Sequence, residues 1–271
     1  GLTVHNLLSL ELLTVEGDQT TLGSTGLDSP GYDLMSLLTG SEGLLGVVTE
    51  VTVKLLPLPE VARVIVAGFD SVRAAGDAVG AVIAAGIIPA GLEMMDALAI
   101  QAAEDFAHAG YPRHAQALLL CELDGTNQEV EQHISAVQTI FSAHGASSMT
   151  VSADEAEREL LWKGRKSAFP AVGRMSPDYY CMDGTIPRSQ VSRVLEEIDR
   201  LSQHYQLRCA NVFHAGDGNL HPLIMFDGGN AQEIARAERF GADILELSVE
   251  CGGCISGVQG GGREKRATMR S

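Results

Sequence analysis

The chain has 271 residues, 45% of them hydrophobic and 20% charged, as expected for a soluble globular protein of one large domain or two ordinary ones. A net charge of −16, from 35 acidic and 19 basic residues, argues against nucleic acid or an anionic membrane as a general partner. No run of about 20 apolar residues marks a membrane span. The N-terminus has no signal-peptide pattern, which predicts a cytoplasmic protein, and no initial Met, which indicates a piece of a longer chain.

The five cysteines are an odd and sparse set for a chain of this length. Such a count predicts reduced thiols rather than a disulfide framework. Cys251 and Cys254 have the C-x-x-C spacing of some metal and redox sites, but no second C-x-x-C completes a zinc site. Chance spacing is the better interpretation.

Residues 1–59 are predicted to form short strands and turns. β-Branched and apolar residues dominate Leu7–Val15 and Val47–Leu56, which we expect to be strands. Between them lies a glycine-rich loop, Thr39–Gly46, in which glycine allows close approach to a ligand and frees N–H groups for a phosphate or a ring edge. From the residues alone, a plain connection is the default interpretation.

Residues 60 to about 186 alternate between predicted strands and helices. The repeated β-α-β pattern with antiparallel returns predicts an α+β sandwich of ferredoxin-like type. The expected strands are Val61–Val66, Ile87–Met95, Ala117–Leu123 and Met149–Val151, and the expected helices are Val72–Ala85, Gln128–Ala143 and Asp154–Arg165.

Cations gather at the end of the last of these helices, in Trp162–Lys166. The default interpretation is ordinary capping, because cations there interact well with the helix dipole. The alternative is a carboxylate clamp, since arginine binds carboxylates through two parallel hydrogen bonds.

The next elements are a strand and turn in Tyr179–Pro187 and two amphipathic helices. Ser189 is predicted to cap the first helix, whose apolar positions are Val191, Val194, Leu195, Ile198 and Leu201. The second helix is expected over Glu233–Ser248.

Between these helices, Asn211–Pro222 contains the strongest turn signal of the chain. Asp217-Gly218 is typical of a two-residue hairpin loop, which would place His214 directly opposite His221. Opposed side chains have Cβ atoms roughly 5 Å apart, so two imidazoles held this way could bind one transition metal. The bland alternative is that two histidines happen to flank a tight turn.

Three separated motifs together resemble the FAD-linked oxidase family. This family includes the flavoprotein subunit of glycolate oxidase and the D-lactate and D-2-hydroxyglutarate dehydrogenases. The motifs are Pro30–Leu34 followed by Gly40–Glu50, then Tyr179–Pro187, then His214–Pro222, and the resemblance runs from residue 1 to about 257.

The resemblance implies a fold of two parts. Residues 1–59 would be the end of an FAD-binding domain of the vanillyl-alcohol-oxidase type. Residues 60–271 would be a cap domain with an antiparallel sheet and flanking helices. Family members begin well before this sequence and continue past it, so we expect a fragment without the N-terminal FAD half and the C-terminus.

The resemblance also implies roles for individual residues. His214 and His221 match two histidine ligands of a divalent metal (Zn, Mn or Fe), and Arg165 matches an arginine that binds the substrate carboxylate. Asp183 matches an acidic position to which we assign no role. The flavin-contacting segment corresponds to Gly40, Ser41, Glu42, Gly43, Gly46 and Val48.

One departure from the family pattern lies near the C-terminus. Where the family has a glutamate as third metal ligand and a histidine as general base, this chain has Val258 and Gln259. Valine cannot bind a metal, and glutamine cannot accept a proton near neutral pH. A damaged or shifted reading frame would explain both losses, and we expect severely impaired activity.

The implied function is FAD-dependent oxidation of a small 2-hydroxy acid, glycolate or D-lactate, with electrons passed to another oxidase subunit or an electron carrier. Two alternatives compete with it. A catalytically silent subunit, or a remnant, is favoured by Val258 and Gln259. A metal-dependent hydrolase would use the histidine pair without flavin, but it leaves Gly40–Gly46 unexplained.

Overall fold

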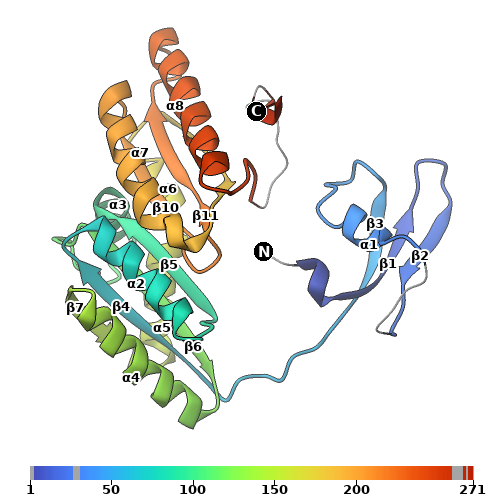
Figure 1. Cartoon of the computed structure of the whole chain (residues 1–271), viewed down its shortest axis with the longest axis horizontal. Coiled ribbons are helices and arrows are strands. Elements are labelled where there is room, and N and C mark those ends of the chain that lie inside the picture. Colours follow the sequence, from blue (N-terminus) through green and yellow to red (C-terminus); the bar gives the residue numbers. More distant parts are fainter. Residues whose placement is uncertain (1–2, 27–30, 258–264, 267, 271) are drawn as a thin grey trace. The chain divides into compact units, whose positions relative to one another are not determined.

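The computed structural model describes residues 3–26, 31–257, 265–266 and 268–270. Val258 and Gln259 lie outside these ranges, so the expectations for them stay predictions. The chain divides into two compact units, a smaller one, Gly1–Leu58, and a larger one, Pro59–Gly257, which also includes the described residues after 264. In Figure 1 the smaller unit is drawn in blue. No helix of the described ranges has the length and apolarity that a membrane crossing requires.

The smaller unit is a three-stranded antiparallel sheet with one short helix. The strands β1 (Leu7–Leu13), β2 (Gln19–Gly23) and β3 (Val47–Val53) lie in the order β2-β1-β3. Leu38 of the helix α1 (Leu34–Leu38) packs on Leu10 and Leu12 of β1. The two predicted strands are present, whereas the sequence reading missed α1. A 3-10 turn, η1 (Thr3–Asn6), precedes β1.

The larger unit is built on a seven-stranded antiparallel sheet in the order β7-β4-β6-β5-β10-β12-β8. Its strands are β4 (Val61–Phe69), β5 (Gly91–Asp96), β6 (Ala117–Gly125), β7 (Ala146–Val151), β8 (Asp178–Cys181), β10 (Cys209–Phe213) and β12 (Pro222–Phe226). A separate two-stranded ladder joins β9 (Gly184–Thr185) to β11 (Asn219–Leu220). The helices are α2 (Val72–Ala84), α3 (Ala97–Ala107), α4 (Asn127–Ala143), α5 (Glu155–Lys166), α6 (Ala168–Val172), α7 (Val191–Tyr205) and α8 (Ala231–Glu250), with 3-10 turns η2 (Arg188–Gln190) and η3 (Thr268–Arg270).

Four of the seven strands have the predicted ferredoxin-like topology. The chain order β4-α2-β5, then β6-α4-β7, gives the spatial order β7-β4-β6-β5, in which the first strand lies between the third and the fourth. Every strand pair is antiparallel. The predicted α+β class with an antiparallel sheet and flanking helices is therefore confirmed.

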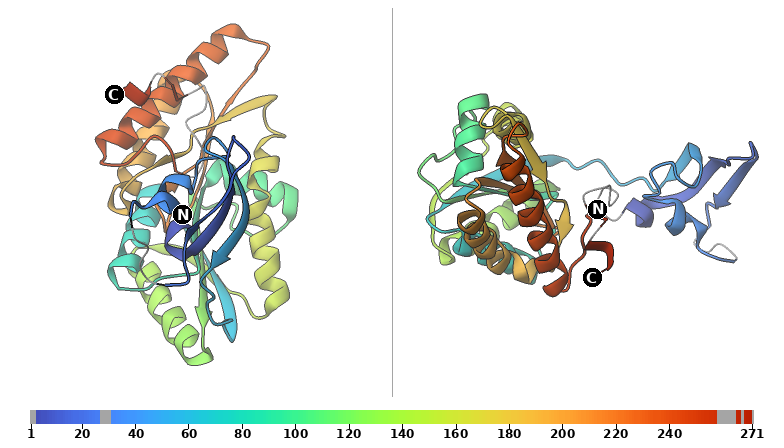
Figure 2. Two further views of the ribbon diagram at one scale, coloured as in Figure 1. Left: turned by 90° about the vertical axis from the view of Figure 1, so that its right-hand side faces the viewer. Right: turned by 90° about the horizontal axis from the view of Figure 1, so that it is seen from above.

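Helices cover both faces of the sheet, so the core has two layers. One layer contains buried side chains of α2, α4, α7 and α8 and the other those of α3, α5 and α6. Figures 1 and 2 show α7 and α8 side by side on the first face. Strand residues alternate between the layers: Phe213 and Met94 pack in the first, Val212 and Met95 in the second.

Two details of the sequence reading are wrong. The hairpin loop has four residues, Ala215–Gly218, because three consecutive N–H groups donate to the carbonyl of His214 and the bridge joins His214 to Asn219. Direct opposition of His214 and His221 is therefore lost. Ser189 does not cap α7 either: it lies within η2, and the N-cap residue is Gln190, which makes no capping hydrogen bond.

Candidate functional site

The strand register brings the site residues to one face of the sheet. Val212 pairs with Met95 and Phe213 with Met94, so His214, one residue past β10, lies beside Glu93 of β5. His214 shares the face of Val212, because alternate strand residues point the same way. Val212 and Met95 pack against α3, α5 and α6. The site thus forms on this helix-covered face, at the end of β10.

The two histidines meet in spite of the shifted register. Their ring centroids are 5.1 Å apart and the rings are nearly perpendicular, at 84°. A shift of two residues preserves the face of a strand, so His221 is a diagonal rather than a direct neighbour of His214. The hairpin signal predicted the meeting of the rings correctly, but with the wrong loop.

His221 is the more buried member of the pair. Its side chain is 11% exposed, against 43% for His214. Burial, together with the neighbouring His214, lowers the pKa of His221 to about 4, although Asp183 opposes this shift. The ring is neutral at pH 7, which is the protonation state that a metal ligand requires.

Three side chains surround the ring of His221. The Sγ atom of Cys181 and the Oδ1 atom of Asp183 each lie 3.8 Å from Nδ1 of His221. The Phe169 ring packs edge-on against the imidazole, with 5.8 Å between the ring centroids. Burial raises the pKa of the Cys181 thiol to about 12, so no thiolate forms there at neutral pH. All five cysteines are free, in line with the prediction of reduced thiols.

Asp183 ties the C-terminal part of the chain to this site. Its carbonyl oxygen accepts hydrogen bonds from Nζ of Lys265 at 2.8 Å and from N of Gly257 at 3.1 Å. The Lys265 ammonium also lies 4.0 Å from Oδ2 of Asp183, and both side chains are buried. The acidic residue without a predicted role is therefore a link between the histidine hairpin and the segment after it.

Arg165 is a buried member of the site and not a surface cap of α5. It is 6% exposed, and its Nη2 atom lies 2.6 Å from Oε2 of Glu93. Lys163, Arg165 and Lys166 do lie in the last turn of α5, as the capping interpretation predicts, but the Arg165 guanidinium turns into the protein. Nη2 is thus paired with Glu93, whereas Nε of Arg165 has no hydrogen-bond acceptor among the described residues. Buried donors of this kind are costly unless a ligand satisfies them.

The donor set fits part of a metal coordination sphere. Within the described ranges, no group of three or more His, Cys, Asp or Glu side chains is arranged to hold a metal ion. The two imidazoles are close, and no hydrogen bond to the Nε2 atom of either ring occurs in the same ranges. His214 and His221 can therefore supply two ligands, and the remainder would have to come from substrate, water or other residues.

The glycine-rich loop of the smaller unit has two kinds of glycine. Gly40 and Gly43 have φ angles of +88° and +81° with open space where a side chain would project. At Gly46, with φ +146°, an added Cβ would lie 2.8 Å from Leu12. Gly46 is thus required by packing inside the unit, whereas Gly40 and Gly43 leave open backbone for a ligand. The predicted flavin contacts of this loop, of Ser41 and Glu42, and of Val48 in β3 stay predictions.

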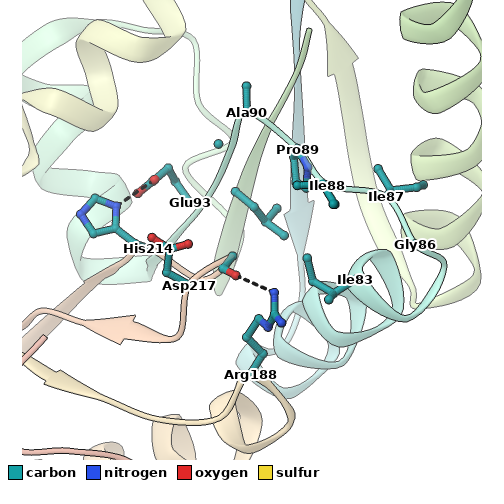
Figure 3. Close-up of a pocket in the computed structure, with 13 residues that line it drawn as sticks. Ile83, Gly86, Ile87, Ile88, Pro89, Ala90, Glu93, Arg188, His214 and Asp217 are labelled. Atoms are coloured by element: carbon teal, nitrogen blue, oxygen red, sulfur yellow. Dashed lines mark hydrogen bonds and ion pairs between the residues drawn. The ribbon is translucent and has the colours of Figure 1, made fainter. Parts of the chain in front are cut away.

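A pocket of about 440 Å³ opens beside His214 (Figure 3). Glu93 and His214 form one part of its wall, and Arg188 donates from Nη1 to the carbonyl oxygen of Gly216 at 3.2 Å. The facing wall is largely apolar and consists of Ile83 and the segment 86–92. The half-exposed imidazole is thus reachable from the pocket.

Glu93 and Lys265 are the site residues that the sequence reading missed. The sequence does contain an indication for Glu93, because it is the one charged residue between Gly91 and Met95 in an otherwise apolar strand. A charge at a core position calls for a partner. The sequence contains no such indication for Lys265, because only the fold brings it to Asp183.

Comparison with known proteins identifies the family. Residues 58–271 match the family model described as FAD linked oxidases, C-terminal domain. The chain is 64% identical over 265 residues to glycolate oxidase subunit GlcD of Escherichia coli K12 and 38% identical over 266 residues to GlcD of Bacillus subtilis. A mitochondrial D-lactate dehydrogenase [cytochrome] of Arabidopsis thaliana is 32% identical over 268 residues.

These alignments cover 98% of the chain but only 53%, 57% and 47% of the three relatives. The chain therefore spans about half the length of the curated relatives it matches.

Solved structures of two enzymes share the fold. p-Cresol methylhydroxylase with substrate bound aligns over 94% of the chain and 58% of its own, with a TM-score of 0.68 and 15% identity. Alkyldihydroxyacetonephosphate synthase aligns over 93% and 50%, with a TM-score of 0.67 and 16% identity. These structures show the fold, and the family match over residues 58–271 shows that the chain belongs to the FAD-linked oxidase family and contains its C-terminal domain.

Proposed function

We propose that this chain provides the substrate-side site of an FAD-linked oxidase that converts a small 2-hydroxy acid, glycolate in the first place, to the 2-oxo acid. One observation carries the proposal. Two imidazoles and a buried guanidinium meet at one end of the sheet, in a chain that is 64% identical to a glycolate oxidase subunit. Imidazoles suit a metal and a guanidinium suits a carboxylate, and a 2-hydroxy acid needs both.

In this proposal His214 and His221 hold a divalent metal (Zn, Mn or Fe) through their Nε2 atoms, and Arg165 holds the substrate carboxylate. The Nε donor of Arg165, which has no hydrogen-bond acceptor among the described residues, supports its role, since a substrate carboxylate would supply one. The loop Gly40–Gly46, with Val48, borders the flavin. Gly40 and Gly43 support that assignment through their open surroundings.

Oxidation of a 2-hydroxy acid removes a proton from the hydroxyl group and a hydride from Cα. When bound, FAD supplies the hydride acceptor and the metal supplies a Lewis acid at the hydroxyl oxygen. The chain's own residues orient the substrate: Arg165 fixes the carboxylate, and burial keeps His221 neutral and available as a ligand. Another oxidase subunit or an electron carrier would take the two electrons onward.

A second candidate is a catalytically silent subunit that keeps the fold. The observation that favours it is Val258-Gln259, at the positions where the family has a metal-binding glutamate and a histidine base. Loss of a general base typically lowers the rate by about 10² to 10⁴. Loss of a ligand weakens metal binding in addition.

A chimera tests the two candidates against each other. The part of Escherichia coli GlcD that precedes the matched region is fused to this chain, and glycolate-dependent dye reduction and the bleaching of the flavin band are measured. We expect weak turnover that the double variant Val258→Glu/Gln259→His raises by a factor of about 10² or more. His214→Ala in the same chimera should abolish it. A double variant without any gain would contradict the assignment of those two positions.

A further inference from the structure

Glu93 is a buried carboxylate in the middle of the larger unit. It is 7% exposed, and its neighbours Leu92, Met94 and Met95 are core residues. A carboxylate at such a position is costly unless it is paired and hydrogen-bonded. The surrounding structure must therefore supply both oxygens with partners.

Each oxygen of Glu93 contacts a different residue of the site. Oε1 lies 2.9 Å from Nδ1 of His214, and Oε2 lies 2.6 Å from Nη2 of Arg165. Figure 3 shows the side chain pointing directly at the imidazole. His214 follows β10 and Arg165 lies in the last turn of α5, so the strand β5 joins two elements that are distant in the sequence.

This pairing determines which nitrogen of His214 carries the proton. A carboxylate paired with a guanidinium is ionised and can only accept hydrogen bonds, so Nδ1 of His214 must donate. In the neutral ring, Nε2 then holds the lone pair. Histidines that bind metals commonly have their other ring nitrogen on a carboxylate, which fixes the tautomer and the ring orientation.

We propose that Glu93 is a positioning residue that holds His214 as the Nδ1–H tautomer, with Nε2 free to bind a metal, and places Arg165 beside it through the second oxygen. The use of Nε2 by a metal rests on the proposed function; the control of the tautomer does not. Because one planar carboxylate makes both contacts, the His214 imidazole and the Arg165 guanidinium are held at a fixed separation. Substrate bound between them would meet a preformed site.

The proposal gives Glu93 a role that a purely structural ion pair with Arg165 would lack. A structural pair would leave the tautomer of His214 unchanged when Glu93 is removed. A histidine side chain free in water favours the Nε2–H tautomer, so loss of Glu93 should move the proton to the nitrogen that a metal needs. The tautomer is thus the discriminating measurement.

The test is ¹⁵N NMR of the ring nitrogens in the metal-free purified chain, with His214 assigned by its absence in His214→Gln. Wild type should show His214 protonated at Nδ1. Glu93→Leu should shift most of the population to Nε2–H. Glu93→Leu alone leaves the Arg165 guanidinium buried without a partner, which could prevent folding. The double variant Glu93→Leu/Arg165→Met removes that guanidinium too, and we expect the same shift to Nε2–H. Far-UV circular dichroism verifies folding.

Glu104→Gln is the matched control. Glu104 is also a buried glutamate of this unit, but its oxygens accept from N of Gly110 and N of Tyr111. It should leave the His214 tautomer unchanged. The proposal is overturned if the double variant keeps Nδ1–H, or if Glu104→Gln shifts the tautomer as much as Glu93→Leu does.

Zinc affinity, measured by competition with a chromophoric chelator, provides the second readout. Glu93→Leu/Arg165→Met should bind zinc about 10- to 100-fold more weakly than Arg165→Met, the loss typical of an outer-shell partner. If His214→Gln leaves zinc binding intact, the metal site of the proposed function fails, and the tautomer result still decides the role of Glu93. An unchanged zinc affinity in the double variant, with His214→Gln losing zinc, would overturn the positioning role.

Discussion

The two units of the chain differ in how much of their apolar surface they bury. The larger unit has a core on both faces of its sheet, and the smaller has, among its described residues, one cluster in which Leu10, Leu12 and Leu38 are buried. Apolar side chains stay exposed in the smaller unit, including Leu44, Val47 and Leu55. The histidine site therefore lies in a unit with an extensive buried core, whereas the glycine-rich loop lies in a unit with little internal stabilisation.

We expect the largest loss of stability from a side-chain truncation in the core of the larger unit. Phe69 is fully buried and packs edge-on against Phe141, with 5.8 Å between the ring centroids. Phe69→Ala should therefore lower the free energy of unfolding by about 3–5 kcal/mol. Trp162, the one tryptophan, lies on α5, so its fluorescence in urea follows this unit.

The matched side-chain truncation in the smaller unit is Leu10→Ala, and amide hydrogen exchange of β1 measures its effect. Because that cluster is small, we expect exchange to become rapid throughout β1. The two units would not differ in internal stabilisation as described if Phe69→Ala lowers the free energy of unfolding by less than about 1 kcal/mol, or if the amides of β1 stay protected from exchange in Leu10→Ala.

The next effect is a pH dependence from His221. The pKa of His221 is about 4 in the folded chain against an ordinary value of 6.5, so the unfolded state binds the proton first as pH falls. The contribution to stability is complete above pH 6.5 and is lost between pH 6.5 and 4. It amounts to about 3 kcal/mol, because one pKa unit corresponds to about 1.4 kcal/mol.

Urea titrations of the metal-free chain, followed by Trp162 fluorescence, measure this loss. The variant His221→Phe has no titrating ring and should show a correspondingly flatter profile over the same pH range. Equal slopes for wild type and variant would mean that His221 titrates normally in the folded chain.

The smallest effect compares two glycines of the loop in the smaller unit. Gly46→Ala should cost about 2 kcal/mol or more, because φ is +146° and the new methyl group would press on Leu12 and on the carbonyl of Leu13. Gly40→Ala has open space and should cost about 1 kcal/mol from its positive φ alone. Amide exchange of β1 measures both, and equal costs would show that packing does not distinguish the two glycines.

Much of the fold was predictable from periodicity. The apolar positions that predicted α4 and α7, and the apolar run that predicted β6, are buried in the structure. The helix α3 was missed because its Ala-rich sequence has no clear polar face, although Asp96 caps it through N of Ala99 at 2.9 Å. Local pattern could not show that this helix packs under β10.

The site was predictable only in part. The hairpin signal brought His214 and His221 together, and an error of two residues in register left both on one face. The pairing of Arg165 with Glu93 could not be predicted from the sequence, because it depends on where α5 lies on the sheet. The link between Lys265 and Asp183 depends in the same way on the tertiary fold.

Metal binding by the purified chain tests the central claim most directly. Equilibrium dialysis against zinc, followed by elemental analysis, should find about one ion per chain, and His214→Ala or His221→Ala should each weaken binding by about 100-fold or more. The exposed His204 of α7 provides the control, and His204→Ala should bind as wild type does. Zinc binding that survives in both site variants would contradict the assignment of the hairpin as the metal site.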